Sequence, residues 1–152
     1  MSKSKDSAHS NGNILQARRL ARQRALQALY QRELNPVPVK SMIEQFMLSQ
    51  DMSKADTEYF EQLLSETSQH VVELDAALKP YLDIPDDQLD PIERSILRLA
   101  AFELTRRLEI PYRVVISEAV SLAKKFGAED GHKFVNGVLD KAVKEWRPFE
   151  SK

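Results

Sequence analysis

Hydrophobic positions recur along the chain at intervals of three and four residues, the spacing of one face of an α-helix. One clear stripe runs through Phe60, Leu64, Val71 and Leu78. No alternating pattern typical of strands competes with it, and no hairpin dipeptide stands in a strand setting. The pattern predicts an all-α fold.

Capping and turn residues divide the chain into helices. The pair Asn13 and Gln16 has capping-box spacing and predicts the start of a long helix, which "NPVPV" ends after Leu34. Asp90 as cap and Pro91 at the first helical position predict a second strong helix start. The further helices expected cover residues 39–49, a stretch from about 53 through 78, 111–127 and 130–146.

The body of the helix after Asp90, "SILRLAAFEL", is apolar on almost every side and is expected at the centre of the fold. The segment "KPYLDIPDDQLDP" holds three prolines and four aspartates, so it predicts a seam between two halves. We therefore expect a compact helical bundle of about seven helices in two packed halves. Residues 1–12 are expected to form a disordered tail before a single domain at 13–148, with subdomains at roughly 13–79 and 80–148.

Composition narrows the possible functions. The chain has 152 residues, a net charge of −1 and no cysteine, which excludes disulfides, thiol catalysis and cysteine-ligated metals. No run of 18 apolar residues occurs, and no signal-type apolar core follows the N-terminal lysines. We expect a cytoplasmic protein without a membrane contact or a cofactor, whose nucleic-acid contacts depend on local patches.

The first local patch is the segment "NILQARRLARQR", which carries Arg18, Arg19, Arg22 and Arg24 with no acidic residue between Asp6 and Glu33. At 100° per residue these arginines surround the predicted helix. Cations at a helix start oppose the macrodipole, and no acid lies at i+4 to pair with them. The usual explanation is a solvated helix face, but the uncompensated charge favours an external phosphate, and hence RNA or DNA.

The second patch is "AKKFGAEDGHKFVNG", residues 123–137. Lysines interleaved with aromatic residues are typical of single-stranded RNA binding, by backbone attraction and base stacking. Structural roles compete with this interpretation: Phe126 belongs to a buried stripe, Phe134 lies at the edge of one, and Asp130 is suited to be a helix cap. The binding candidates here are Lys124, Phe126, Asp130, Lys133 and Phe134.

Three blocks of sequence, "ARRLARQRALQALYQ", "LDPIERSILRLAAFEL" and "IPYRVVISEAVSLAKKFGAEDGHKFVNGVLDK", resemble the bacterial transcription antitermination factor NusB over roughly residues 15–147. The resemblance implies a non-enzymatic adaptor made of two small helical bundles. Such a factor binds a boxA element in single-stranded nascent RNA together with ribosomal protein NusE. It then helps the RNA polymerase elongation complex to read through terminators, notably in ribosomal RNA operons.

The resemblance also implies roles for individual residues. Arg18, Arg19 and Arg22 match the family's arginine-rich RNA-contacting motif, to which Arg24 adds one more arginine. Tyr30 matches the tyrosine that follows this motif, and Glu93 matches a glutamate tied to RNA or partner binding. The family's second RNA-facing segment corresponds to Lys124, Phe126, Gly127, Asp130, Lys133 and Phe134.

Other functions were weighed against this one. The alternative is a DNA-binding helix-turn-helix regulator, because residues 117–139 predict helix, glycine turn and helix, although the second helix is apolar for a recognition helix. The pair Glu129 and His132 has a di-iron spacing, but a second copy is missing from the sequence. A methyltransferase module lacks the glycine-rich cofactor motif, since the chain has only four glycines.

Overall fold

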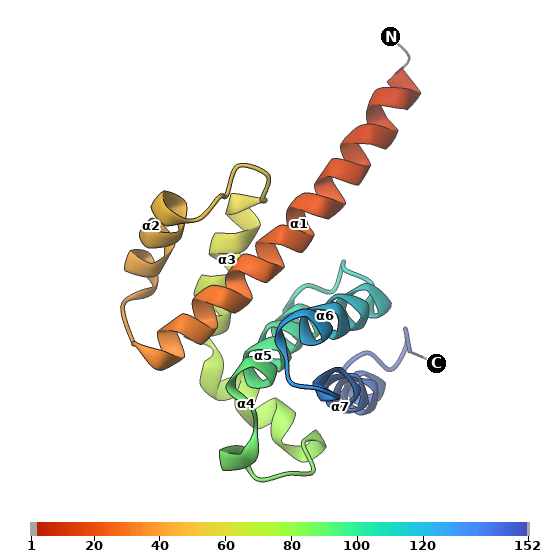
Figure 1. The fold of residues 1–152 in the computed structure, drawn as a ribbon. Helices are drawn as coiled ribbons and strands as arrows, with labels where there is room; N and C mark the ends of the chain where they lie inside the picture. Colours follow the sequence, from red (N-terminus) through yellow and green to blue (C-terminus); the bar gives the residue numbers. More distant parts are fainter. Residues whose placement is uncertain (1–2, 152) are drawn as a thin grey trace. The chain divides into compact units, whose positions relative to one another are not determined.

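The computed structural model describes residues 3–151, without the side chains of residues 3–11 and 86. Within this range the chain is all-α, as predicted, and Figure 1 shows its arrangement. The helices are α1 (Lys3–Leu34), α2 (Val39–Ser49), α3 (Thr57–Gln69), α4 (Val71–Leu78), α5 (Pro91–Arg106), α6 (Tyr112–Phe126) and α7 (Gly131–Trp146). Two short 3-10 helices, η1 (Lys79–Tyr81) and η2 (Asp86–Gln88), lie between α4 and α5.

The chain divides into two compact units, Met1–Ser65 and Glu66–Lys152. The division falls inside α3, whereas the sequence placed it near residues 79 and 80. Proline and aspartate residues interrupt helices, but the border of a compact unit depends on which helices pack together, and composition does not report that.

Helix α1 begins at Lys3, not at the predicted cap Asn13. No proline precedes Asn35, and Gly12 costs a helix interior only about 1 kcal/mol, so the helix passes through the predicted start. Residues 3–12, expected in a tail, belong to α1, and Met1 and Ser2 lie outside the described residues.

The first unit is built on contacts between aromatic and aliphatic side chains. The rings of Phe46 on α2 and Phe60 on α3 stack with their centroids 5.7 Å apart. Leu26 on α1 is buried as well and belongs to the core of the same unit. At the start of α3, the N–H of Asp56 donates to the carbonyl of Ala17 at 3.0 Å, which attaches the α2–α3 loop to α1.

The hydrophobic stripe from Phe60 to Leu78 predicted one helix, but the structure forms two. The backbone leaves helical geometry at His70, where φ is −107° and ψ is 22°. The imidazole Nε2 lies 3.4 Å from Glu66, and Nδ1 lies 4.0 Å from Glu73. Because the apolar spacing continues through this break, periodicity alone could not reveal it.

Helix α5 occupies the centre of the second unit, where it packs against α4, α6 and α7. Its side chains are buried on nearly every side, as "SILRLAAFEL" predicted. The predicted cap is confirmed: the carboxylate of Asp90 accepts hydrogen bonds from the N–H groups of Ile92 and Glu93, at 2.8 and 3.2 Å. This cap satisfies two of the N–H groups that a helix start leaves without partners.

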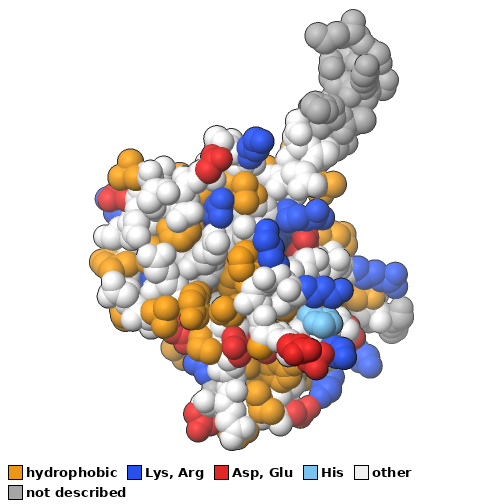
Figure 2. All heavy atoms as spheres, viewed as in Figure 1, with side chains coloured by type: hydrophobic (Ala, Val, Ile, Leu, Met, Phe, Trp, Pro, Cys, Tyr) orange, Lys and Arg blue, Asp and Glu red, His pale blue; other side chains and the backbone are white. Residues whose placement is uncertain are grey.

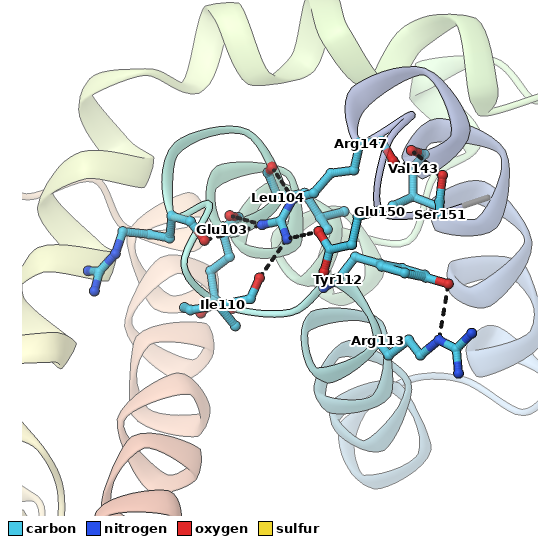
Figure 3. Close-up of polar contacts among 10 residues, drawn as sticks. Glu103, Leu104, Ile110, Tyr112, Arg113, Val143, Arg147, Glu150 and Ser151 are labelled. Carbon is cyan, nitrogen blue, oxygen red and sulfur yellow. Dashed lines mark hydrogen bonds and ion pairs between the residues drawn. The ribbon is translucent and has the colours of Figure 1, made fainter.

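The other end of α5 is capped by Arg147, which follows α7 and is only 5% exposed. Its guanidinium donates to the carbonyls of Leu104 at 3.0 Å and Glu103 at 3.2 Å. It also donates to the carbonyls of Arg107 and Ile110 in the α5–α6 connection, as Figure 3 shows in part. The carbonyls of Glu103 and Arg107 also accept backbone N–H groups, from Arg107 and Ile110. The guanidinium therefore adds a donor chiefly for the carbonyls of Leu104 and Ile110.

Glu150 completes this cap. One carboxylate oxygen accepts from Arg147 at 2.8 Å, and the other accepts from the N–H of Tyr112, the first residue of α6, at 2.9 Å. Hydrogen bonds from Arg147 and from this N–H lower the pKa of Glu150. The pair Arg147 and Glu150 thus joins the end of α5, the start of α6 and the end of α7 (Figure 3).

We expect Arg147→Met to lower the free energy of unfolding by about 3 kcal/mol or more, because it removes the guanidinium that donates to the carbonyls of Leu104 and Ile110 while the apolar stem is kept. Urea denaturation followed by far-ultraviolet circular dichroism measures this loss. The matched control is Lys144→Met on the exposed face of α7, expected to change stability by less than about 0.5 kcal/mol. A loss below about 1 kcal/mol for Arg147→Met would show that water replaces the guanidinium.

Candidate nucleic-acid interface

The arginine segment lies well inside α1, and its four guanidinium groups differ in exposure. Arg19 is exposed, Arg18 and Arg24 are half-buried, and Arg22 is only 5% exposed. Because α1 begins at Lys3, these residues lie several turns beyond its first turn, so the predicted conflict with the macrodipole does not arise.

The first side chains of the arginine segment are exposed. Ile14 and Leu15 are 55% and 64% exposed, while Leu26 further along is buried. Along the arginine segment, α1 therefore passes from exposed residues to residues packed in the core. Arg18 therefore lies at the edge of the packed region, and Arg22, one turn further along, is buried within it.

Tyr59 on α3 holds two of the four arginines. Its ring is 3% exposed, and the guanidinium carbons of Arg18 and Arg22 lie 4.6 and 5.6 Å from its centroid. Both distances are within the range of cation–π attraction. No local pattern predicts this role, because Tyr59 stands beside Phe60 in the apolar stripe of α3 and has the pattern of a core residue.

The expectation that the charge of the arginine segment is uncompensated is wrong for Arg18. Its Nε lies 4.0 Å from a carboxylate oxygen of Asp56. The other oxygen of Asp56 accepts the N–H of Tyr59 at 3.0 Å, so Asp56 also caps α3. An ion pair at this distance neutralises Arg18 only in part. Asp56 was missed because it lies nearly 40 residues from Arg18 in the sequence.

Arg24 is engaged within the first unit as well. One of its terminal nitrogens donates to the side chain of Gln27 at 2.9 Å, and the other reaches the carbonyl of Asp51 at 3.5 Å. Hydrogen bonds from Ser53 lower the pKa of Asp51, and the charges of Lys54 and Arg24 add to the effect. Arg24 therefore supports the loop between α2 and α3. Tyr30, further along α1, is half-buried.

The second candidate segment lies in the other unit, at the turn between α6 and α7. Lys124 and Lys133 are exposed. Phe126 and Phe134 are half-buried, so Phe126 is not the core residue that its stripe predicted. Each ring keeps an accessible part that could contact a base. On the face drawn in Figure 2, basic side chains lie among hydrophobic and polar ones rather than in a uniform field.

The turn itself has a defined backbone. Gly127 ends α6 with φ of −83°, and a Cβ there would lie 2.7 Å from the carbonyl oxygen of Ala123. Asp130 adopts the left-handed conformation with φ of 66° and makes no side-chain cap, contrary to the competing interpretation. Its carboxylate instead lies 3.2 Å from the amine of Lys133.

Glu93 lies beneath this turn rather than on the surface. It is 7% exposed, and its Oε2 is buried without a hydrogen-bond partner. A Cβ at Gly131 would lie 2.7 Å from that oxygen, so the turn packs directly on the carboxyl group. Burial raises the pKa of Glu93 and the charge of Asp90 adds to this, while a hydrogen bond from the N–H of Ala128 opposes it.

The pair with di-iron spacing lies at the α6–α7 turn and the start of α7. Glu129 is exposed and His132 is half-buried. Across the described residues, no group of three or more histidine, aspartate or glutamate side chains is arranged to hold a metal ion. Within the same part of the chain, no helix is both long and apolar enough to cross a membrane.

We expect Glu93→Gln to raise the free energy of unfolding near neutral pH. Because the pKa of Glu93 is raised by folding, the folded state holds this proton more tightly than the unfolded chain. Its ionisation therefore costs stability as the pH rises from the unfolded-state pKa through the folded-state pKa. The amide removes this cost and can still accept from Ala128.

Unfolding free energies measured across a pH series test this expectation. The advantage of Glu93→Gln should vanish at acidic pH, where Glu93 is protonated in both states. Glu129→Gln, an exposed carboxyl in the same turn, is the matched control and should change stability little at any pH. A variant less stable than the parent at neutral pH would show that the charged carboxylate supports the turn.

This chain is similar to known proteins over most of its length. The family model described as the NusB family matches residues 19–144. The transcription antitermination protein NusB of Pseudoalteromonas atlantica is 50% identical over 134 residues, which cover 88% of this chain and 96% of the relative.

Solved structures give the same result. NusB of T. maritima superposes with a TM-score of 0.74 at 30% identity, covering 84% of this chain and 90% of that chain. A crystal structure of antitermination factors NusB and NusE in complex with dsRNA gives a TM-score of 0.70 at 30% identity, covering 87% and 99%. With a family model matched over most of its length and a half-identical relative, this chain belongs to the NusB family.

Proposed function

We propose that this chain is a cytoplasmic transcription antitermination factor. It binds boxA-type single-stranded RNA together with ribosomal protein NusE and promotes read-through by RNA polymerase, notably in ribosomal RNA operons. One observation carries the proposal: a chain with the same fold and 30% identity is described in a complex of NusB, NusE and RNA. The half-identical relative is named a transcription antitermination protein.

The first unit supplies charge for the RNA backbone in this proposal. Arg19 is exposed, and Arg18 rests on Tyr59 with about a third of its side chain exposed. Guanidinium groups bind phosphate through paired hydrogen bonds, and a guanidinium held by an aromatic ring loses less freedom on binding. Arg22 supports this surface from below, because it is buried against the same ring.

The second unit supplies groups for the bases. Phe126 and Phe134 are half-buried, so their accessible parts can stack on unpaired bases, while Lys124 and Lys133 attract phosphates. The exposed carboxylate of Asp130 can accept a hydrogen bond from a base amino group. Glu93 acts in this scheme by supporting the turn from beneath. The protein places RNA and partner, and it is not an enzyme.

A binding titration tests the proposal. We expect boxA-type single-stranded RNA to bind more tightly than duplex RNA or duplex DNA of the same sequence, and more tightly still when the ribosomal partner is present. The related complex contains dsRNA, so the duplex RNA arm is essential. Preference for duplex DNA would favour a helix-turn-helix regulator instead, and a lack of RNA binding with and without the partner would refute the proposal.

Substitutions of Arg19, which is exposed, and Arg22, which is buried, should distinguish an effect on RNA binding from an effect on protein stability. We expect Arg19→Ala to reduce the slope of log K against log[salt] by about 0.7, one contact on single-stranded RNA, with stability changed by less than about 0.5 kcal/mol. Arg22→Ala should instead lower the free energy of unfolding by about 1 kcal/mol or more, because it empties a buried site against Tyr59.

Fluorescence anisotropy at several salt concentrations measures the slopes, and urea denaturation measures the stabilities. Arg106→Ala, an exposed cation in the last turn of α5, is the control for a general loss of positive charge. If Arg19→Ala left the salt slope unchanged, Arg19 would have no place in the phosphate-binding surface.

A further inference from the structure

A groove of about 490 Å³ runs along the second unit between α6 and α7. The wall from α6 includes Arg113, Ser117, Ser121 and Lys124, which are all exposed. None of these four residues belongs to the buried stripe of α6, which consists of Val115, Ile116, Ala119, Leu122 and Ala123. The polar part of this wall is therefore formed by residues that the packing of the unit leaves outside its core.

The wall from α6 forms a row of hydrogen-bond donors. Arg113, Ser117 and Ser121 follow one another at intervals of four residues, so they lie along one side of the helix. The hydroxyl groups of Ser117 and Ser121 make no hydrogen bond with any part of the chain that the structure describes. Donors without partners in an open groove are available to a ligand with acceptor oxygens.

A cation stands at each end of this row. Arg113 and Lys124 are eleven positions apart on α6, which corresponds to about 16 Å along a helix. Arg113 donates through Nε to the hydroxyl of Tyr112 at 3.1 Å, which leaves its two terminal nitrogens for another partner (Figure 3). The separation suits a ligand with negative charges repeated along its length rather than a single anion.

The opposite wall and the floor agree with such a ligand. Asn136 and Asp140 of α7 line the groove, and Asp140 is its single acidic residue. Asn136 donates to Asp140 at 3.4 Å, which partly satisfies that carboxylate within the protein. Ile116 and Val120 add apolar surface between the polar groups, where sugars or bases could rest.

We infer that this groove binds a further stretch of the RNA strand, a few nucleotides beyond those held at the α6–α7 turn. The inference rests on the proposed RNA-binding function. Lys124 belongs both to the groove and to the segment proposed to face RNA, so a strand that leaves the turn can enter the groove without a gap. Arg113 then holds a phosphate at the far end, and Ser117 and Ser121 donate to phosphate or 2′-hydroxyl oxygens along the way.

Charge favours RNA over a protein partner at this groove. Two cations face one acid, and the acid is already hydrogen-bonded to Asn136. A helix of a protein partner binds by placing its apolar face in an apolar groove, and Ile116 and Val120 provide too narrow an apolar surface for that. The polar row on α6 instead suits a ligand whose oxygen atoms recur along its whole length.

The test compares RNAs of two lengths on the full chain. A short boxA-type single strand is titrated beside the same strand extended by six uridines at its 5′ end or at its 3′ end, with anisotropy read at several salt concentrations. We expect one of the two extensions to tighten binding about tenfold and to steepen the salt slope. Arg113→Ala should remove this gain and reduce the slope for the extended strand by about 0.7, while the short strand binds as before.

Two further variants test whether the effect belongs to the groove. Ser121→Glu places a negative charge in the row and should weaken the extended strand while leaving the short one unchanged. Arg106→Ala, which removes an exposed cation of the same unit outside the groove, should affect neither length. The inference is overturned if neither extension tightens binding, if Arg113→Ala weakens both lengths equally, or if Arg106→Ala has the same effect as Arg113→Ala.

The outcomes distinguish this inference from the proposed function. If the short strand binds and neither extension helps, the groove has no RNA role and the proposed function stands. If no RNA binds to the parent chain, both fail. If Arg113→Ala weakens binding of the ribosomal partner while the extensions have no effect, the groove is a protein-docking site and the inference is overturned.

Discussion

A buried cation, Arg147, joins the helix ends of the second unit. Arg147 donates to carbonyls at the end of α5 and in the α5–α6 connection, and its partner Glu150 accepts from the first N–H of α6. Helix ends leave backbone groups without partners, and burial makes an unpaired carbonyl costly. From a position just after α7, these two residues bind groups at the end of α5, in the α5–α6 connection and at the start of α6, so they help to fix where α6 begins. The start of α6 in turn sets the position of the residues of α6 that form a wall of the groove.

In each unit, a buried side chain lies directly beneath residues of the candidate interface. Tyr59 lies beneath the guanidinium groups of Arg18 and Arg22 in the first unit. Glu93 lies beneath the α6–α7 turn in the second unit, with its carboxyl group packed against Gly131. In both places a buried group holds residues that are more accessible to a ligand. A mutation in the supporting residue therefore changes binding through the geometry of its neighbours, which makes stability controls essential in each unit.

The residues of the candidate interface show where sequence reasoning succeeded and where it stopped. The density of positive charge predicted a phosphate-binding patch at the arginines of α1. The spacing of these arginines could not show that Arg22 is buried or that Arg18 approaches Asp56. The aromatic residues of the α6–α7 turn were predicted as stacking candidates, and both remain partly accessible. Whether these residues contact RNA stays a prediction. Exposure depends on what packs against a side chain, and a helical wheel describes only one helix.

The sequence by itself determined the all-α class, most helix ends and the central place of α5, because the spacing of apolar residues and the capping chemistry of Asp90 and Pro91 are local properties. It also determined the family, through long blocks of matching residues. Only the tertiary structure decided the start of α1, the break at His70 and the caps supplied by Arg147 and Glu150. In these caps the interacting groups are separated by about 40 positions along the chain. Their contribution exists only once the helices are packed, because a hydrogen bond to a distant carbonyl has no signature in local spacing.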